Sequence, residues 1–221
     1  MRLGFFLVLL LTMTTTTSSV LASPLKLNYS LFFGYMKTIY KLDYEYVTTA
    51  FYLQDKDSGQ ACLIKNAQIV VDQKREPITF TTQGQLLPFY SQQHRKDGAM
   101  IEVELLAGQE NYQCDLQVTL MAKEFESVQL SDPKLALISE QLEGILKKNA
   151  GMIGKYFLPT FSGVRLQLTE PLSKQQLSAL PKQVNLSENG DLLISNVLLN
   201  SDLTDSTVLL KIDRITPWIT P

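Results

Sequence analysis

The stretch SDPKLALISEQLEGILKKNAGMIGKY, residues 131–156, marks the point at which the hydrophobic pattern of this chain changes. Before it, short apolar runs alternate with polar residues. Within it, apolar residues recur at spacings of three and four, at Leu135, Ile138, Leu142, Ile145, Met152 and Tyr156. A polar capping side chain followed by Pro133 is a typical helix start, because proline fits the first helical position. The stretch predicts one long helix and, with strands on both sides, an α+β fold.

The glycines of this helix are compatible with two packing modes. Gly144 and Gly151 lie seven residues apart, and Asn149 interrupts the apolar seam as a polar residue does in some coiled coils. Three heptads barely support a coiled coil, so a helix laid across a sheet is the favoured interpretation. Gly151 and Gly154 each cost a helix about 1 kcal/mol relative to alanine, which predicts a kink in the last turns.

Short strands are predicted on the amino-terminal side of the helix. Residues 45–53 are rich in β-branched and aromatic side chains and end at the turn-forming cluster 55–59. Residues 100–105 alternate apolar and charged side chains. Further strands are predicted over residues 62–64, 68–71, 78–81 and 113–121. Evenly spaced antiparallel strands of this kind are typical of a small sandwich or a meander.

The start of this half allows two interpretations. Leu31, Tyr35 and Ile39 lie four residues apart, which predicts a helix capped by Ser30 and reaching about Tyr40. In this interpretation residues 28–30 close a short strand before the helix, and the alternative is one continuous strand.

The chain after Pro159 returns mainly to strands. Strands are expected over residues 164–168, 183–186, 192–199 and 207–212, with a short helix at 173–180 and a hairpin turn at Asn189-Gly190. The carboxy-terminal segment is therefore β-rich. Because composition gives no clean boundary, residues 24–130 and 131–221 are treated as two halves that are able to share one core.

The first 22 residues resemble a cleaved signal peptide. Arg2 is their only charge, an apolar run covers residues 3–13, and Val20-Leu21-Ala22 fits a signal-peptidase site with cleavage between Ala22 and Ser23. A run of about 11 residues is half of the roughly 20 needed for a lasting membrane anchor. No cysteine lies near the cleavage point, so we expect a soluble exported protein without a lipid anchor or an integral membrane span after processing.

The charge balance argues against nucleic-acid binding. Of 20 Lys and Arg residues one lies in the signal peptide, leaving 19 against 22 Asp and Glu, a net charge near −3. The densest basic stretches are Lys74-Arg75 and residues 94–96, each two or three residues long. The chain as a whole is too balanced to recruit nucleic acid or anionic lipid.

The two cysteines agree with export. Cys62 and Cys114 have no third partner, and in an oxidising compartment such a pair forms one disulfide. We expect this disulfide to tie an early strand to the last strand of the amino-terminal sheet. Two thiols and one histidine do not make a closed zinc site, and no metal or cofactor site is predicted.

No catalytic motif is found in the chain, and no catalytic residue is predicted. His94 is the only histidine, and its polar surroundings predict an exposed loop tip rather than a triad member. Glu102 and Glu104 share one face of a strand at a spacing compatible with a glycosidase pair, but they are interpreted as the polar half of an amphipathic strand. Asp55 and Asp57 are assigned to a hairpin turn rather than to calcium binding.

Aromatic residues are the remaining candidates for a binding surface. They gather at Tyr29, Phe32, Phe33, Tyr35, Tyr40, Tyr44, Tyr46, Phe51 and Tyr52. Exposed together, such residues would form a carbohydrate or hydrophobic-ligand surface, although most are expected in the core. Trp218 is expected to hold the carboxy-terminus in place.

Three stretches resemble the DUF2987 family of uncharacterised exported gammaproteobacterial proteins. They are residues 28–33, residues 114–118 ahead of a Lys-Glu pair, and residues 151–159. The resemblance implies a Gram-negative periplasmic setting and supplies no catalytic residues. The sequons at Asn28 and Asn185 would then be incidental.

These observations favour a non-catalytic periplasmic protein that binds another protein or an envelope component, through the long helix or an exposed sheet face. An envelope hydrolase with a dispersed carboxylate site and a carrier of a small apolar ligand are the alternatives. A concave site with several carboxylates would favour the hydrolase, a deep apolar cavity the carrier, and a flat apolar patch the binding protein.

Overall fold

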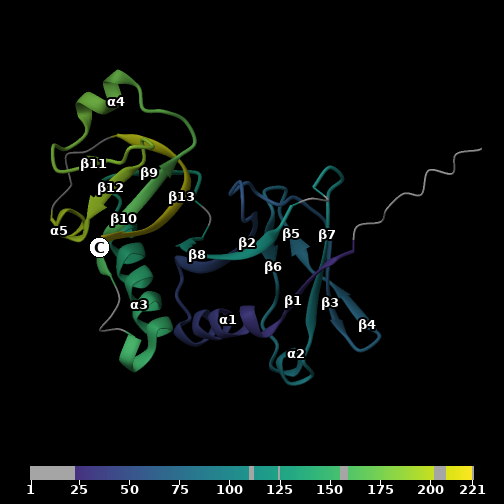
Figure 1. Cartoon of the computed structure of the whole chain (residues 1–221). Helices are drawn as coiled ribbons and strands as arrows, with labels where there is room; N and C mark the ends of the chain where they lie inside the picture. The colour runs from purple at the N-terminus through teal and green to yellow at the C-terminus, as the bar shows by residue number, and fades with distance from the viewer. Residues whose placement is uncertain (1–22, 110–111, 124, 155–158, 202–207, 221) are drawn as a thin grey trace, which may run out of the picture.

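Three antiparallel sheets and their helices make up the part of the chain that this computed structural model describes, residues 23–109, 112–123, 125–154, 159–201 and 208–220 (Figure 1). Two of the sheets belong to the amino-terminal half, and Figure 1 shows them on one side of the molecule. The third sheet, which follows them in the sequence, lies on the other side. The arrangement confirms the α+β class.

The amino-terminal half contains two four-stranded sheets. The first has the order β1 (Leu25–Asn28), β7 (Met100–Leu105), β3 (Ile64–Val71), β4 (Lys74–Pro77). The second has the order β5 (Thr79–Phe80), β6 (Gln85–Leu87), β2 (Val47–Asp55), β8 (Cys114–Ala122). Both sheets contribute to one buried cluster, with Ile101 from the first and Leu86 and Phe51 from the second. A cluster enclosed by two sheets is what a small sandwich requires.

Strand β3 is longer than the sequence predicted. Residues 62–64 and 68–71 were expected as separate strands, but residues 64–71 form one strand. Its pairing with β7 shifts between Ile64 and Asn66. A bulge at this position lets polar residues stand inside the strand without ending it, which is why the apolar pattern alone divided it in two.

The first helix, α1 (Ser30–Leu42), confirms the helical alternative for the start of this half. The predicted cap is wrong, because the Asn28 side chain and not that of Ser30 accepts the first free backbone N–H, at 2.8 Å. The predicted seam is also displaced by one residue. Phe32 and Met36 are buried, whereas Leu31 is 50% exposed.

The long helix is α3 (Lys134–Gly154). Asp132 accepts the backbone N–H of Lys134 at 2.9 Å, and Leu135, Ile138, Leu142 and Ile145 are buried as predicted. Gly151 has φ 71° and breaks the helix, which confirms the predicted kink. Tyr156 and the side chain of Met152 lie outside the described residues.

The third sheet packs against α3. Its order is β11 (Asn185–Leu186), β12 (Leu192–Ser195), β10 (Thr160–Leu168), β13 (Leu209–Thr220), β9 (Ser127–Gln129). The second buried cluster lies here, and it also includes Val47 and Ala122 from the ends of β2 and β8. Residues from both halves of the sequence therefore contribute to this cluster.

Local signals predicted several features of the third sheet. Ser173 caps α4 (Lys174–Ala179) in a capping box, and Gly190 takes φ 83° in the hairpin between β11 and β12. The predicted strand over residues 192–199 is half wrong. It ends at Ser195, whose hydroxyl accepts the backbone N–H of Leu198 and begins α5 (Asn196–Leu199).

The last strand, β13, continues well past the predicted end at Ile212. Pro217 lies inside it. Proline is normally excluded from the interior of a sheet because it has no backbone N–H to donate to a neighbouring strand. In this strand β9 pairs only with residues 209–211, so the part that contains Pro217 pairs on one side only, with β10. Trp218 lies opposite Gly163 of β10 and is half-buried there, so it contributes to holding the carboxy-terminal strand.

Candidate functional site

His94 is not the exposed loop residue that the sequence predicted. It lies on a short helix, α2 (Gln92–Lys96), which begins where the Ser91 hydroxyl accepts the backbone N–H of His94 at 3.2 Å. The His94 side chain is only 13% exposed. The sequence around His94 offers no apolar side chains to pack against it. They come instead from Tyr29, which is 65 residues earlier, and from Phe89, which precedes α2.

A continuous chain of aromatic side chains runs from α1 to α2, and we call it the ring chain. One end is Tyr40 of α1, which is 68% exposed, and the other end is Phe89, which precedes α2 and is 44% exposed. The ring centroids of its neighbours are 4.8, 5.2, 6.3, 5.8 and 5.2 Å apart in the order Tyr40, Tyr90, Phe33, Tyr29, His94, Phe89.

Helix geometry explains the exposed half of the ring chain. Phe33 and Tyr40 are seven residues apart on α1, so their Cα atoms are separated by about 10.5 Å along the axis. Tyr90 fits between them, stacked on Phe33 with 22° and on Tyr40 with 21° between the ring planes. The inserted ring has both faces covered, and Tyr40 keeps an exposed side.

Tyr29 is the buried centre of the ring chain. Its hydroxyl donates to the carbonyl of Phe89 and accepts the backbone N–H of Ser91, both at 2.8 Å. Burial raises the pKa of Tyr29, while the hydrogen bond from Ser91 acts in the opposite direction. These two bonds fix the segment before α2 against the start of α1.

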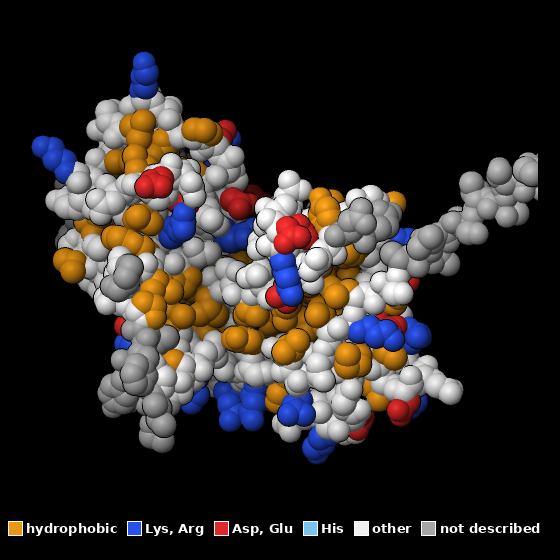
Figure 2. Space-filling view, viewed as in Figure 1, with side chains coloured by type: hydrophobic (Ala, Val, Ile, Leu, Met, Phe, Trp, Pro, Cys, Tyr) orange, Lys and Arg blue, Asp and Glu red, His pale blue; other side chains and the backbone are white. Residues whose placement is uncertain are grey.

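Four exposed cations lie on the same two helices, and we call them the basic edge: Lys37 and Lys41 of α1, and Arg95 and Lys96 of α2. Lys37 Nζ is 5.9 Å and Arg95 Cζ is 6.0 Å from the Phe33 ring centroid. Neither helix contains an acidic residue. Figure 2 shows Lys and Arg side chains along the lower edge of the molecule, where Figure 1 places α1 and α2, below a band of hydrophobic side chains.

An open groove of about 710 Å³ lies on the other side of His94, between α2 and the β3–β4 hairpin. Asp72, Glu76 and Asp97 contribute carboxylates to its lining, and His94 Nε2 is 3.7 Å from Glu76 Oε1. His94 Nδ1 is buried and has no hydrogen-bond partner. Within the described residues no cluster of His, Cys, Asp and Glu is able to hold a metal ion.

Glu102 belongs to the predicted polar half of β7 but is not exposed. It is 8% exposed, whereas Glu104 remains exposed. Arg75 donates to Glu102 Oε2 at 2.6 Å and Lys26 Nζ lies 3.2 Å from Oε1, and these bonds, that of Arg75 foremost, lower the pKa of Glu102. The four-stranded sheet supplies both cations from its two edge strands, β4 and β1. Glu102 is therefore neutralised within the sheet by two cations, which is a structural role.

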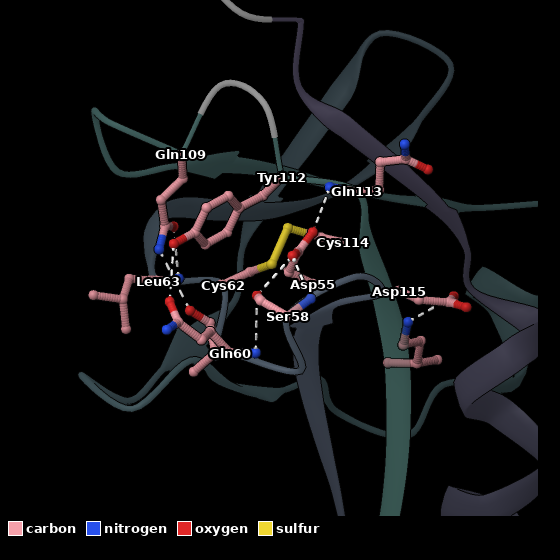
Figure 3. Close-up of a disulfide and its surroundings, with 12 residues drawn as sticks. Asp55, Ser58, Gln60, Cys62, Leu63, Gln109, Tyr112, Gln113, Cys114 and Asp115 are labelled. Carbon is pink, nitrogen blue, oxygen red and sulfur yellow. Dashed lines mark hydrogen bonds between the residues drawn. A yellow bond between two sulfur atoms is a disulfide. The ribbon is translucent and has the colours of Figure 1, made fainter.

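The disulfide between Cys62 and Cys114 is present, with the Cα atoms 6.2 Å apart (Figure 3). It ties the start of β8 to the connection just before β3, close to the predicted arrangement. Asp55 lies beside it in the predicted turn, is 7% exposed, and accepts bonds from Ser58 Oγ at 2.7 Å and the Gln113 N–H at 2.8 Å. These bonds, with Ser58 contributing most, lower the pKa of Asp55.

The remaining predicted residues do not add to this site. Phe32, Phe51 and Tyr52 are buried as expected. Ser23 is exposed, and Ala22 lies outside the described residues. No helix among the described residues is long and apolar enough to cross a membrane.

Sequence reasoning missed the ring chain and the basic edge. Their signals were present in the seven-residue spacing of Phe33 and Tyr40, in the run Leu87-Pro88-Phe89-Tyr90, and in the absence of acids from residues 30–42 and 92–96. No local rule connects the two segments.

The comparisons with known proteins support the predicted resemblance. The model of a family described as a protein of unknown function, DUF2987, matches residues 21–168. No curated protein and no solved structure matches the chain significantly. The matched residues contain α1, α2, the whole ring chain and both cysteines.

Proposed function

Because this chain belongs to the DUF2987 family, whose description assigns no activity, we propose from its surface that it is an exported periplasmic protein that binds a component of the cell envelope without catalysis. Export is supported by residues 1–22, with the apolar run and the site between Ala22 and Ser23. The disulfide between Cys62 and Cys114 agrees with an oxidising compartment.

The observation that carries the binding role is the exposed end of the ring chain. Tyr40 is 68% exposed although it stacks on Tyr90, and Lys37 and Lys41 lie three residues before it and one residue after it on α1. Large exposed side chains beside polar groups are typical of interaction surfaces. Tyrosine suits such surfaces because it supplies apolar area together with a hydroxyl.

The proposal is tested by photo-crosslinking in intact cells. A photoreactive phenylalanine derivative replaces Tyr40, and in a matched control it replaces Val197 of α5, which is 82% exposed in the other half of the molecule. We expect a discrete envelope adduct from position 40 and none from position 197. Adducts of equal intensity at both positions, or none at position 40, would contradict the proposal.

A second function, an envelope hydrolase, is favoured by one observation. The groove beside His94 brings Asp72, Glu76 and Asp97 together with the only histidine of the chain. Mixed carboxylate and imidazole groups are able to transfer protons in hydrolysis. Glu76→Gln separates the two functions: it would abolish a hydrolytic activity located here and would leave crosslinking at position 40 unchanged.

A carrier of small apolar ligands receives less support. The groove beside β8, of about 390 Å³, combines Val118, Leu120 and Leu146 with Gln167 and Arg214 and is open at the surface. A site for an apolar ligand is usually enclosed and lined mainly by apolar side chains.

A further inference from the structure

The cations of the basic edge form no ion pair among the described residues, as is also true of Lys74, Lys123, Lys134, Lys148, Lys174 and Lys182, but Lys37 and Arg95 share the Phe33 ring. Within the described residues, no carboxylate lies within ion-pair distance of Lys37, Lys41, Arg95 or Lys96. Ion pairs are formed instead by Lys26, Lys56, Lys65, Arg75, Lys147, Arg165, Lys211 and Arg214. Lys37 and Lys41 are also four residues apart on α1, where like charges destabilise a helix. The fold therefore gathers positive charge on this surface without neutralising it.

The nearest carboxylates in sequence do not cancel this charge. Asp43 and Asp97 follow α1 and α2 as their carboxy-terminal caps. Asp97 Oδ1 accepts a hydrogen bond from Gln93 Nε2 at 2.7 Å. The carboxylates of Asp72, Glu76 and Asp97 line the groove that borders α2, so the positive charge without a nearby carboxylate is that of Lys37 and Lys41 on α1, with Arg95 beside the Phe33 ring. The net charge does not reveal this concentration of lysines because it averages over the whole chain.

The shape of the basic edge favours a surface over a peptide as its partner. Lys37 and Lys41 are exposed on α1, whose buried side carries Phe32 and Met36, and Arg95 and Lys96 are exposed on α2. Peptides usually bind in a groove or along a strand edge, and the groove that borders α2 is lined by the carboxylates of Asp72, Glu76 and Asp97, which do not suit an acidic peptide. Exposed cations together with a tyrosine such as Tyr40 are typical of proteins that lie at a lipid interface.

We infer that the basic edge docks reversibly on an anionic phospholipid surface, with Lys37, Lys41, Arg95 and Lys96 facing the headgroups and Tyr40 entering the interfacial layer. This inference rests on the proposed function and names the envelope component. Each cation close to an anionic surface contributes about a fivefold gain in partitioning at low salt. The binding is therefore weak, and it decreases as salt shortens the range of electrostatic attraction.

The test is flotation of the exported, purified protein with vesicles. One set contains phosphatidylglycerol and phosphatidylcholine, and the other contains phosphatidylcholine alone. The protein should float with the first set only and detach at high salt. The double variant Lys37→Gln/Lys41→Gln should reduce binding roughly 25-fold, as two cations of about fivefold each predict. The control Lys174→Gln/Lys182→Gln removes the same charge from exposed positions in the other half of the chain and should bind normally.

Failure to bind the anionic vesicles, equal binding to both sets, or equal loss in both double variants would overturn the inference. Circular dichroism should show that each variant is folded, because the replaced lysines are exposed. The crosslinking result at position 40 separates this inference from the proposed function. A protein adduct without vesicle binding would retain the binding role and reject the lipid surface, whereas the absence of both would reject both.

Discussion

The carboxylate of Asp55 accepts a hydrogen bond at 2.8 Å from the backbone N–H of Gln113, 58 residues further along the chain and next to Cys114. Ser58 donates two further bonds to the same carboxylate, at 2.7 and 3.0 Å. The Asp55 carboxylate therefore holds the end of β2 to the start of β8, and the adjacent disulfide ties the same start of β8 to the connection before β3 (Figure 3).

Loss of the disulfide should destabilise the protein clearly. Cys62 and Cys114 are separated by 52 positions, and closing such a loop removes unfolded-state entropy worth about 4 kcal/mol. Cys62→Ser and Cys114→Ser should each lower stability by about this amount in urea unfolding, and the double variant should be little worse than either. A double variant that loses twice as much would show that the cysteines act independently.

Acid should weaken the protein partly through Asp55. The bonds from Ser58 and Gln113 hold its folded-state pKa below the unfolded value of about 4. The stabilisation is therefore present above about pH 4 and is lost as the pH falls through the lower, folded-state pKa. Asp55→Asn should lower the Tm at pH 7 and reduce its decline in acid, measured by calorimetry from pH 7 to pH 2. The exposed Asp57 provides the control, because Asp57→Asn should leave the profile almost unchanged.

Two glycines should respond oppositely to alanine. Gly163 of β10 has φ 152°, and a Cβ there would lie 2.0 Å from the carbonyl oxygen of Ile194. Gly163→Ala should therefore cost about 3 kcal/mol or more. Gly34 lies on α1 with no atom near its added Cβ, so Gly34→Ala should stabilise the protein by about 1 kcal/mol. Thermal unfolding of both variants measures the difference, and a neutral Gly163→Ala would contradict the close approach of β10 to residue 194.

His94→Ala should weaken the fold without removing function. The imidazole packs against Tyr29 and Phe89, so its removal should cost about 1 to 2 kcal/mol. Crosslinking from position 40 and vesicle binding should persist in the folded variant, because Lys37 and Arg95 are retained. Loss of a cellular function while both binding readouts survive would favour the hydrolase instead.

Cleavage should occur after Ala22. Ala22 and Val20, two positions before it, fit the specificity of signal peptidase. The residue directly after the cleavage point is Ser23 and not a cysteine that would receive a lipid. Intact-mass measurement of protein released from the periplasm should therefore give a chain that begins at Ser23. A mass that includes residues 1–22, or an added lipid, would show that the segment has another role.

Much of the secondary structure could be predicted because its causes are local. The seam of α3 depends on residues three and four apart, such as Ile138 and Leu142, and the caps at Asp132 and Ser173 need only the next few residues. Errors arose where pairing overrode the local pattern. The bulge at Asn66 joined two predicted strands, and the unpaired side of β13 allowed Pro217 inside a strand.

By itself the sequence determined the α+β class, the kink at Gly151 and the pairing of two cysteines, because each depends on short-range periodicity, backbone freedom or simple counting. Only the tertiary structure decided the candidate site. Tyr90 stacks on Phe33 and Tyr40, which precede it by at least 50 residues in the sequence. Arg95 and Lys37 both lie over the Phe33 ring. Such encounters depend on how α1 and α2 pack on the two sheets, and the burial energy that sets this packing is shared among residues from every strand.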